Sequence, residues 1–230
     1  MDVNGLTKAQ AAEYYRKRGW YPIPLCWPDE KGNCGCGQGH KNRQIGKAPL
    51  VNWKGIKPSL KQVREWWRKW PNANIGILLD HSGLLVVDPD SSEAEKEVEL
   101  LQIGGVKCRT GRGSHRYFRR PENIPAVRLT KKGASGEVDI LAAGYSIAPP
   151  SVHRNGKSYL WEEELPEKLP EPPGWVRNFF TQRQDEPEPG KQEISFEEAL
   201  ARNRDRIPRK VLETLLAERD EKGQIGRAHV

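Results

Sequence analysis

The chain has 230 residues, enough for one substantial hydrophobic core with a smaller appendage. Charged residues make up 30% of it, no run approaches the ~20 apolar residues of a membrane span, and the N-terminus lacks a signal-peptide pattern, so we expect a soluble cytoplasmic protein without a membrane partner. The net charge of +7 favours polyanionic partners such as nucleic acid or nucleotides.

The first part of the chain predicts two helices on either side of a long loop. Thr7 caps the first helix with Gln10 in the capping-box position, and residues 20–25 predict a short strand. A second capped helix begins at Ser59. Between them, residues 26–49 are rich in Gly, Lys and Cys without periodicity, so this loop needs something to hold it.

The middle of the chain is rich in strands. Apolar or alternating runs predict strands at residues 74–79, 84–88, 106–110, 114–120, 136–141 and 145–151. The first two of these runs are joined by a short turn and suit neighbouring strands. A helix is expected at 93–101. Strands thus outnumber helices, which predicts an α+β fold with a mixed or antiparallel sheet.

The C-terminal part has a different composition. Residues 181–193 contain no apolar residue apart from prolines and indicate a linker. Ser195 and Pro208 then begin two helical patterns. We therefore expect a main domain at 1–180 and a small helical subdomain at 194–230.

An Asp-Pro-Asp sequence follows the most apolar strand. Because side chains alternate along a strand, Asp88 and Asp90 can project from the same side where the strand leaves the core. Two carboxylates at this spacing favour a hard divalent cation between them. The same residues are also typical of a strand-to-helix turn, in which Asp90 or Ser91 caps the next helix.

Asp139 supplies a third acid. It lies on the strand predicted at 136–141, on the opposite face from the β-branched residues of that strand. Together with Asp88 and Asp90 it completes the acids needed for a pair of metal ions in phosphoryl transfer.

A glycine turn lies between the acid-bearing strands. Gly111 and Gly113 let backbone amides approach an anion, Arg109 and Arg112 add positive charge, and His115 begins the next strand. The same Gly-Arg-Gly sequence also makes a good hairpin turn.

The order of these motifs resembles the archaeo-eukaryotic primase superfamily. DPD at 88–90, GSH at 113–115 and VDI at 138–140 match its acid-x-acid pair, its histidine motif and its lone acid. The bifunctional primase–polymerase branch of mobile elements and phages is closer still. Segments that resemble this branch are 11–25, 46–49, 71–77, 110–118 and 148–161.

The resemblance covers residues 8–180 and implies a primase-like catalytic core that makes primers on single-stranded DNA from NTPs or dNTPs, in plasmid or phage replication. Asp88, Asp90 and Asp139 would hold Mg²⁺ or Mn²⁺, and His115 would contact the triphosphate of the incoming nucleotide. Further candidates for nucleotide contacts are Lys47, Arg112, Ser114, Ser151 and His153. The last two could instead cap the turn that follows two prolines. No Walker phosphate loop occurs, and members of this branch often continue into a helicase. We therefore expect that the chain stands alone, is a fragment, or takes its motor from a partner such as a replicative helicase.

The long loop contains cysteines that could hold it in place by binding a metal ion. Cys26, Cys34, Cys36 and His40 are four ligands that suit a tetrahedral Zn²⁺ site, although their spacing differs from paired Cys-x-x-Cys knuckles. Unliganded cysteines are the alternative, while a disulfide is disfavoured in a reducing cytoplasm. Cys108 lies on a strand and is expected to be an ordinary buried thiol.

Two other classes of function compete with a primase. A metal-dependent nicking nuclease could use the same three acids but would want a His-hydrophobic-His pair, whereas Ser114 and Arg116 flank His115. A non-catalytic zinc-containing DNA-binding module would explain the charge and the cysteines but leave the acids without a role.

Overall fold

The computed structural model describes residues 2–101, 103–133 and 136–185. Contacts divide the chain into two units, Met1–Thr181 and Gln182–Val230. The helical subdomain expected at 194–230 lies outside the described residues. The last described helix, α5 (Gly174–Asp185), runs into the segment whose composition indicates a linker.

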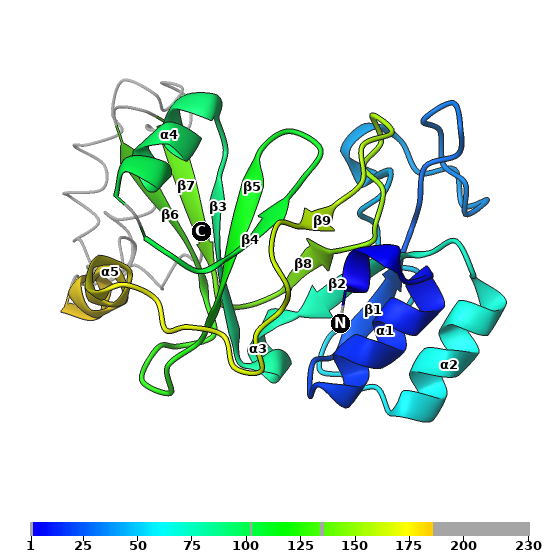
Figure 1. Cartoon of the computed structure of the whole chain (residues 1–230), viewed down its shortest axis with the longest axis horizontal. Coiled ribbons are helices and arrows are strands. Elements are labelled where there is room, and N and C mark those ends of the chain that lie inside the picture. The colour runs from blue at the N-terminus through cyan, green and yellow to red at the C-terminus, as the bar shows by residue number, and fades with distance from the viewer. Residues whose placement is uncertain (1, 102, 134–135, 186–230) are drawn as a thin grey trace, which may run out of the picture. The chain divides into compact units, whose positions relative to one another are not determined.

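The first unit is an α+β fold built on two antiparallel sheets (Figure 1). Strands β1 (Pro22–Leu25), β2 (Asn74–Leu78) and β8 (Tyr145–Ala148) form the smaller sheet in the order β1–β2–β8. The larger sheet has the order β6–β7–β3–β5–β4–β9. Its strands are β3 (Leu84–Pro89), β4 (Val106–Arg109), β5 (Ser114–Arg119), β6 (Arg128–Gly133), β7 (Gly136–Leu141) and β9 (Leu160–Trp161). The expected α+β class and antiparallel pairing are confirmed.

Strands β2 and β3 were expected to pair, and this prediction is wrong. The short helix α3 (Leu79–Ser82) lies between them, and Gly83 ends it in the left-handed region, with φ +62°. Strand β2 pairs with β1 and β8, whereas β3 pairs with β5 and β7. The chain therefore passes from one sheet to the other at this point.

Two helices cover the smaller sheet. Helix α1 (Lys8–Lys17) has the predicted capping box between Thr7 and Gln10, and α2 (Leu60–Lys69) begins after Ser59 as expected. These helices lie side by side in Figure 1 and pack with β1 and β2 into the first hydrophobic cluster. Short 3-10 turns occur at Val3–Gly5 and Asn42–Gln44.

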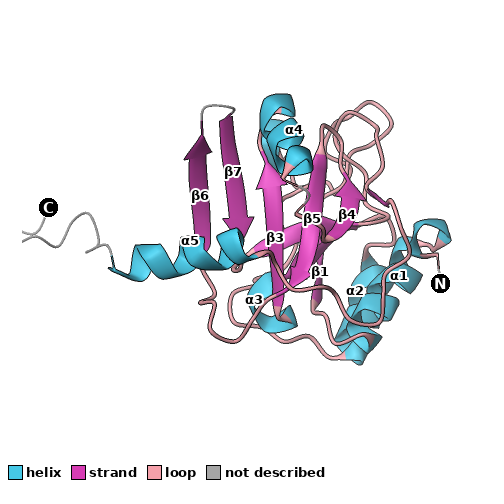
Figure 2. Cartoon of the chain, turned by 60° about the vertical axis from the view of Figure 1, so that its left-hand side comes forward, coloured by secondary structure: helices cyan, strands magenta, loops and turns pink. Residues whose placement is uncertain are grey.

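The larger sheet has two different faces. On one face, Leu85, Val87 and Phe118 pack against α4 (Ser92–Leu100) and α5, which lie on the same side of the sheet in Figure 2. On the other face, Val86 and Tyr117 pack into the first cluster. Because side chains alternate, this second face also carries the acids of β3 and β7 beyond the end of the apolar packing.

None of the helices in the described part of the chain combines the length and apolar character that a membrane crossing requires.

Candidate active site

The polar residues of the second face form a row across the larger sheet. Asp88 on β3 is the direct cross-strand partner of Asp139 on β7, which in turn faces Thr130 on β6. On the other side of β3, His115 Nε2 lies 3.3 Å from Asp88 Oδ1. The structure therefore brings together, on one face, residues of the three motifs that the sequence singled out.

His115 is oriented by both sheets. Its Nδ1 lies 3.2 Å from the hydroxyl oxygen of Ser146 on β8, and that oxygen accepts a 2.8 Å hydrogen bond from the Tyr117 hydroxyl. A proton on Nε2 faces Asp88 both when Ser146 donates to the neutral ring and when the protonated ring donates to Ser146. The histidine is thus held with one nitrogen directed toward the acids.

The two acids of the Asp-Pro-Asp motif differ in their electrostatics. Burial opposes ionisation of Asp88, but the charge and hydrogen bond of His115 and the charge of Lys47 outweigh it and lower the pKa of this carboxyl. At Asp90, burial raises the pKa, and the neighbouring charges of Asp88 and Asp139 raise it further. Such mutual repulsion between carboxylates is relieved by a cation placed among them.

Helix α4 does not need Asp90 as its cap. The Ser91 hydroxyl accepts the N–H of Ala94 at 3.0 Å and is the N-cap of the helix. Of the two capping residues that the sequence offered, the structure uses Ser91, which leaves the exposed Asp90 carboxylate available for another role.

Asp139 is held by two neighbours on the edge strand β6. Arg128 Nη2 donates to its Oδ2, and Thr130 Oγ1 donates to its Oδ1 at 2.6 Å. The Asp139 side chain is 5% exposed, whereas that of Arg128 is 65% exposed and can move away. Arg128 therefore provides the positive charge beside Asp139 in this structure.

The three carboxylates fit hard divalent cations in ligand type. Mg²⁺ and Mn²⁺ prefer carboxylate oxygens, and Asp88 and Asp139 present theirs from adjacent strands. Among the described residues, the oxygen atoms of the three acids lie farther apart than the ligand atoms of the cysteine cluster described below. A cation would take the place that the Arg128 guanidinium has beside Asp139.

Lys47 and His153 lie near this row. The charge of Lys47 affects the pKa of both Asp88 and His153. The His153 ring packs directly on Gly111, where an added Cβ would lie 2.2 Å from the ring Cγ. Gly111 also accepts a 2.9 Å hydrogen bond from the side chain of Asn155. Gly111 is therefore required for close packing of the hairpin turn against the segment that carries His153.

Ser151 and Ser114 are placed differently from the expected nucleotide contacts. Ser151 is fully buried, and its hydroxyl oxygen accepts the N–H of Ile75 at 2.8 Å. Ser114 is buried and directs both its N–H and its hydroxyl to the Glu95 carboxylate on α4. Both serines therefore join parts of the protein together in this structure, and their contact with a nucleotide stays a prediction.

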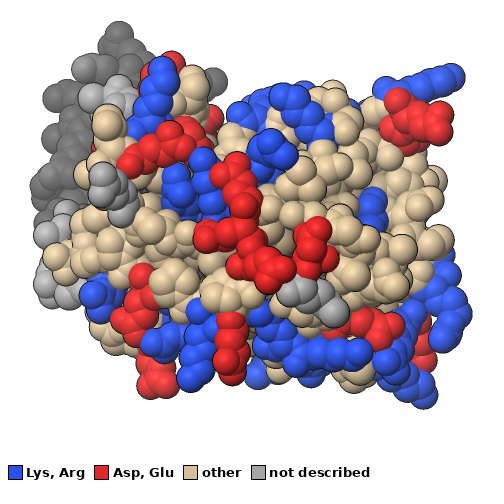
Figure 3. Space-filling model, viewed as in Figure 1, with Lys and Arg blue, Asp and Glu red and all other residues tan. Residues whose placement is uncertain are grey.

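Arg112 lies at the tip of the β4–β5 hairpin and is exposed. Figure 3 shows Lys and Arg side chains gathered over this tip. A pocket of about 680 Å³ adjoins the turn on the α4 side, where Lys107 and Arg109 are accompanied by Glu95 and Glu99. Charges of both signs therefore line this pocket, which lies on the α4 side of the sheet and not on the face that carries the row of acids.

The residues that hold the acids and the histidine were not predicted from the sequence. Arg128 and Thr130 alternate in the segment RLTKKG, a pattern that indicates a strand with one polar face. Ser146 lies in an apolar strand, where a lone hydroxyl indicates a hydrogen-bond partner on the facing element.

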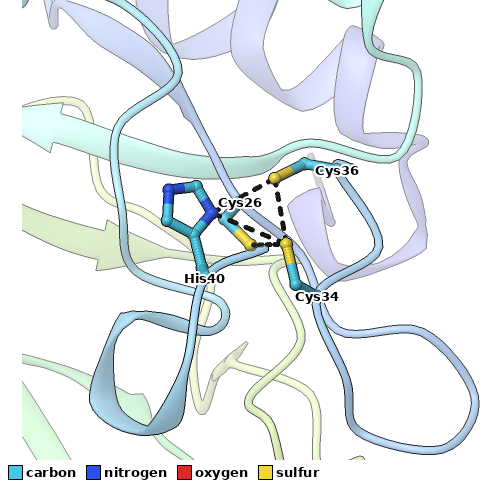
Figure 4. Close-up of side chains that lie close together, drawn as sticks. All are labelled: Cys26, Cys34, Cys36 and His40. Atoms are coloured by element: carbon cyan, nitrogen blue, oxygen red, sulfur yellow. Dashed lines mark hydrogen bonds between the residues drawn. The ribbon is translucent and has the colours of Figure 1, made fainter. Parts of the chain in front are cut away.

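The long loop brings the predicted metal ligands together (Figure 4). The ligand atoms of Cys26, Cys34, Cys36 and His40 all lie within 4.8 Å of one another. Cys34 Sγ is 3.6 Å from Cys26 Sγ and 3.2 Å from Cys36 Sγ, and His40 Nδ1 is 3.2 Å from Cys36 Sγ. Tetrahedral zinc with Zn–S of about 2.3 Å separates its ligand atoms by roughly 3.5–3.8 Å. The cluster therefore has the ligand types and approximately the spacing of a zinc site.

Backbone N–H groups point at these sulfurs. The sulfur of Cys34 accepts the N–H groups of Cys36 and His40, and that of Cys26 accepts the N–H of Gly46. Burial opposes ionisation of Cys34, but the hydrogen bonds outweigh it and lower its pKa to about 6. Burial raises the pKa of Cys26 to about 12. Bound metal would deprotonate Cys26, since a coordinating thiol ionises.

Comparison with protein families identifies one match. A family model described as the N-terminal domain of bifunctional DNA primase/polymerase matches residues 11–175, the greater part of the chain. The comparison with curated proteins gave no match. The matched span contains the row of acids, His115 and the cysteine cluster.

Proposed function

The chain belongs to the bifunctional DNA primase/polymerase family, and from this premise we propose that it synthesises primers on a single-stranded DNA template from NTPs or dNTPs. The observation that carries the proposal is the pairing of Asp88 with Asp139, with His115 beside them on the same face. A DNA-directed nucleotidyltransferase needs acids and a phosphate-binding group in this arrangement. Replication of a plasmid or phage, with a helicase as partner, is the setting that we propose.

Asp88, Asp90 and Asp139 are the residues that would hold Mg²⁺ or Mn²⁺. When bound, these ions activate the attacking 3′-hydroxyl and neutralise charge on the departing pyrophosphate. The protein contributes position and charge: His115 and Lys47 provide hydrogen-bond donors next to the acids, where a triphosphate would lie. No protein nucleophile is required by this reaction.

The function is tested by incubating the protein with single-stranded template, NTPs or dNTPs, and Mn²⁺ or Mg²⁺. New oligonucleotide product supports the proposal. Shortened template would indicate the nicking nuclease instead, and a mobility shift without product would indicate a non-catalytic DNA-binding module.

His115→Ala should weaken nucleotide binding and slow turnover by about 10²-fold in kcat/KM, because it removes the donor beside Asp88 that would contact the triphosphate. DNA binding should persist, since that is dominated by other basic side chains. Steady-state kinetics and a template mobility shift, measured on the same preparation, check both statements. Unchanged KM and kcat would show that His115 only packs against Ser146 and Tyr117.

We also propose that the Cys₃His cluster binds one structural Zn²⁺. Cys34→Ser should remove the zinc and expose the loop at 26–49 to proteolysis, because this loop contributes few apolar residues to the core. Elemental analysis of the purified protein should find about one zinc per chain. The matched control is Cys108→Ala, which changes a buried thiol on β4 and should retain the metal. Equal zinc content in both variants would refute the site.

A further inference from the structure

A backbone segment joins the Cys₃His cluster to the row of acids. Cys26 follows β1 and is fully buried, and its N–H donates to the carbonyl of Ala48 at 2.7 Å. Its sulfur accepts the N–H of Gly46. One metal ligand therefore makes hydrogen bonds to both residues that flank Lys47.

The conformation of this segment is fixed from the other side as well. Gly46 is buried with φ +81°, and an added Cβ would lie 3.3 Å from the Val152 carbonyl oxygen. Its own carbonyl accepts a 3.0 Å hydrogen bond from Asn74. The Lys47 carbonyl accepts a 3.1 Å hydrogen bond from the Tyr145 hydroxyl. The backbone around Lys47 is thus held between the cluster and strands β2 and β8, while Lys47 itself is exposed to solvent.

The positive charge of Lys47 acts on two groups of the candidate active site. Its positive charge is close enough to Asp88 to lower the pKa of that carboxyl, and it opposes protonation of His153. A cation next to paired acids and a histidine suits the phosphates of a nucleotide.

We propose that the Cys₃His cluster, when it holds its metal, positions Lys47 for contact with the triphosphate of the incoming nucleotide. This inference rests on the proposed function, since it assigns Lys47 to the same site. Without the metal, the loop at 26–49 loses its cross-links and Lys47 becomes less ordered. Nucleotide binding would then have to order Lys47, and this cost in entropy lowers the affinity. Loss of the metal and loss of the Lys47 side chain should therefore have the same effect on nucleotide affinity.

A double-mutant cycle tests this equivalence. The dissociation constant of a non-hydrolysable dNTP analogue with Mg²⁺ is measured by calorimetry for wild type, Cys34→Ser, Lys47→Ala and the double variant. We expect each single change to weaken binding about tenfold, as for one charge-assisted contact, and the double variant to bind no more weakly than either. The control Lys31→Ala changes an exposed lysine of the same loop and should bind as wild type does. Unchanged affinity in Cys34→Ser, or losses that multiply to about 100-fold, would overturn the proposal.

Trypsin provides a readout that does not depend on nucleotide. Cleavage after Lys47, identified by mass spectrometry, should accelerate at least about tenfold in Cys34→Ser, or in wild type treated with a chelator, and should slow again when zinc is restored. Cleavage after Lys69 in α2 should stay slow, which separates local loosening from unfolding. Unchanged cleavage after Lys47 on metal loss would defeat the inference and leave the proposed function standing. A wild-type protein that bound no nucleotide would defeat the proposed function and this inference together.

Discussion

Asp88→Asn should reduce primer synthesis by about three orders of magnitude or more, because the amide removes the negative charge that a divalent cation requires. It also replaces the carboxylate that faces His115 Nε2 at 3.3 Å. The fold should persist, since a partly exposed acid is exchanged for a residue of the same shape and repulsion from Asp90 is relieved. Initiation and primer extension, each measured with Mg²⁺ and with Mn²⁺, check the activity, and thermal unfolding checks the fold.

Two further variants and one control sharpen this result. Asp139→Asn and Asp90→Asn should lose synthesis to a similar degree if all three carboxylates hold the ions. Asp80→Asn in α3 is the matched control, since it removes an acid that lies outside the row and should retain full activity. Near wild-type synthesis by Asp88→Asn would refute the metal-binding role, and loss of activity in the control would show that the assay reports general damage.

Local strand geometry was enough to predict part of the placement of the acids. An apolar strand that ends at Asp88, and alternation around Asp139, are enough to place each carboxylate on one face of its own strand. Local geometry does not predict that β3 and β7 are neighbours, or the register that sets these two residues opposite each other. Both depend on contacts between distant parts of the chain. The family resemblance anticipated that the two acids act together, and the structure supplies the pairing.

The wrong expectation for β2 and β3 has the same origin. Their sequences are equally apolar, and a short connection between apolar runs normally indicates a hairpin. Strand β2 instead pairs with β8, a partner much later in the chain, and α3 redirects the chain in between. Sheet membership is decided by such long-range pairing, which the local sequence does not encode.

The capping signals were more informative, because they are local. The reciprocal bonds between Thr7 and Gln10 occur as expected, and the Ser59 hydroxyl accepts the N–H of Gln62. At Asp90 and Ser91 the sequence offered two caps, and only the structure shows that Ser91 is used. Both residues are good caps, so the choice depends on how the strand leads into the helix.

Asn74→Ala should lower the free energy of unfolding by about 3–5 kcal/mol, the largest effect on stability that we expect from a single substitution. Asn74 is fully buried on β2. Its Nδ2 donates to the carbonyls of Gly46 at 3.0 Å and Val152 at 2.7 Å, and its Oδ1 accepts the N–H of Val152 at 2.9 Å and the Lys8 ammonium at 3.1 Å. Alanine would leave these groups without that partner in a largely buried region. Lys8, whose pKa burial already lowers to about 8, would keep its bond to the Asn72 carbonyl. Urea unfolding measures the loss. The matched control is Asn72→Ala, which changes an exposed asparagine two positions earlier and should change the free energy of unfolding by less than about 0.5 kcal/mol. A loss below about 1 kcal/mol for Asn74→Ala would show that the backbone of Gly46 and Val152 is held by other contacts, and that the network around this side chain does not fix the loop against β2.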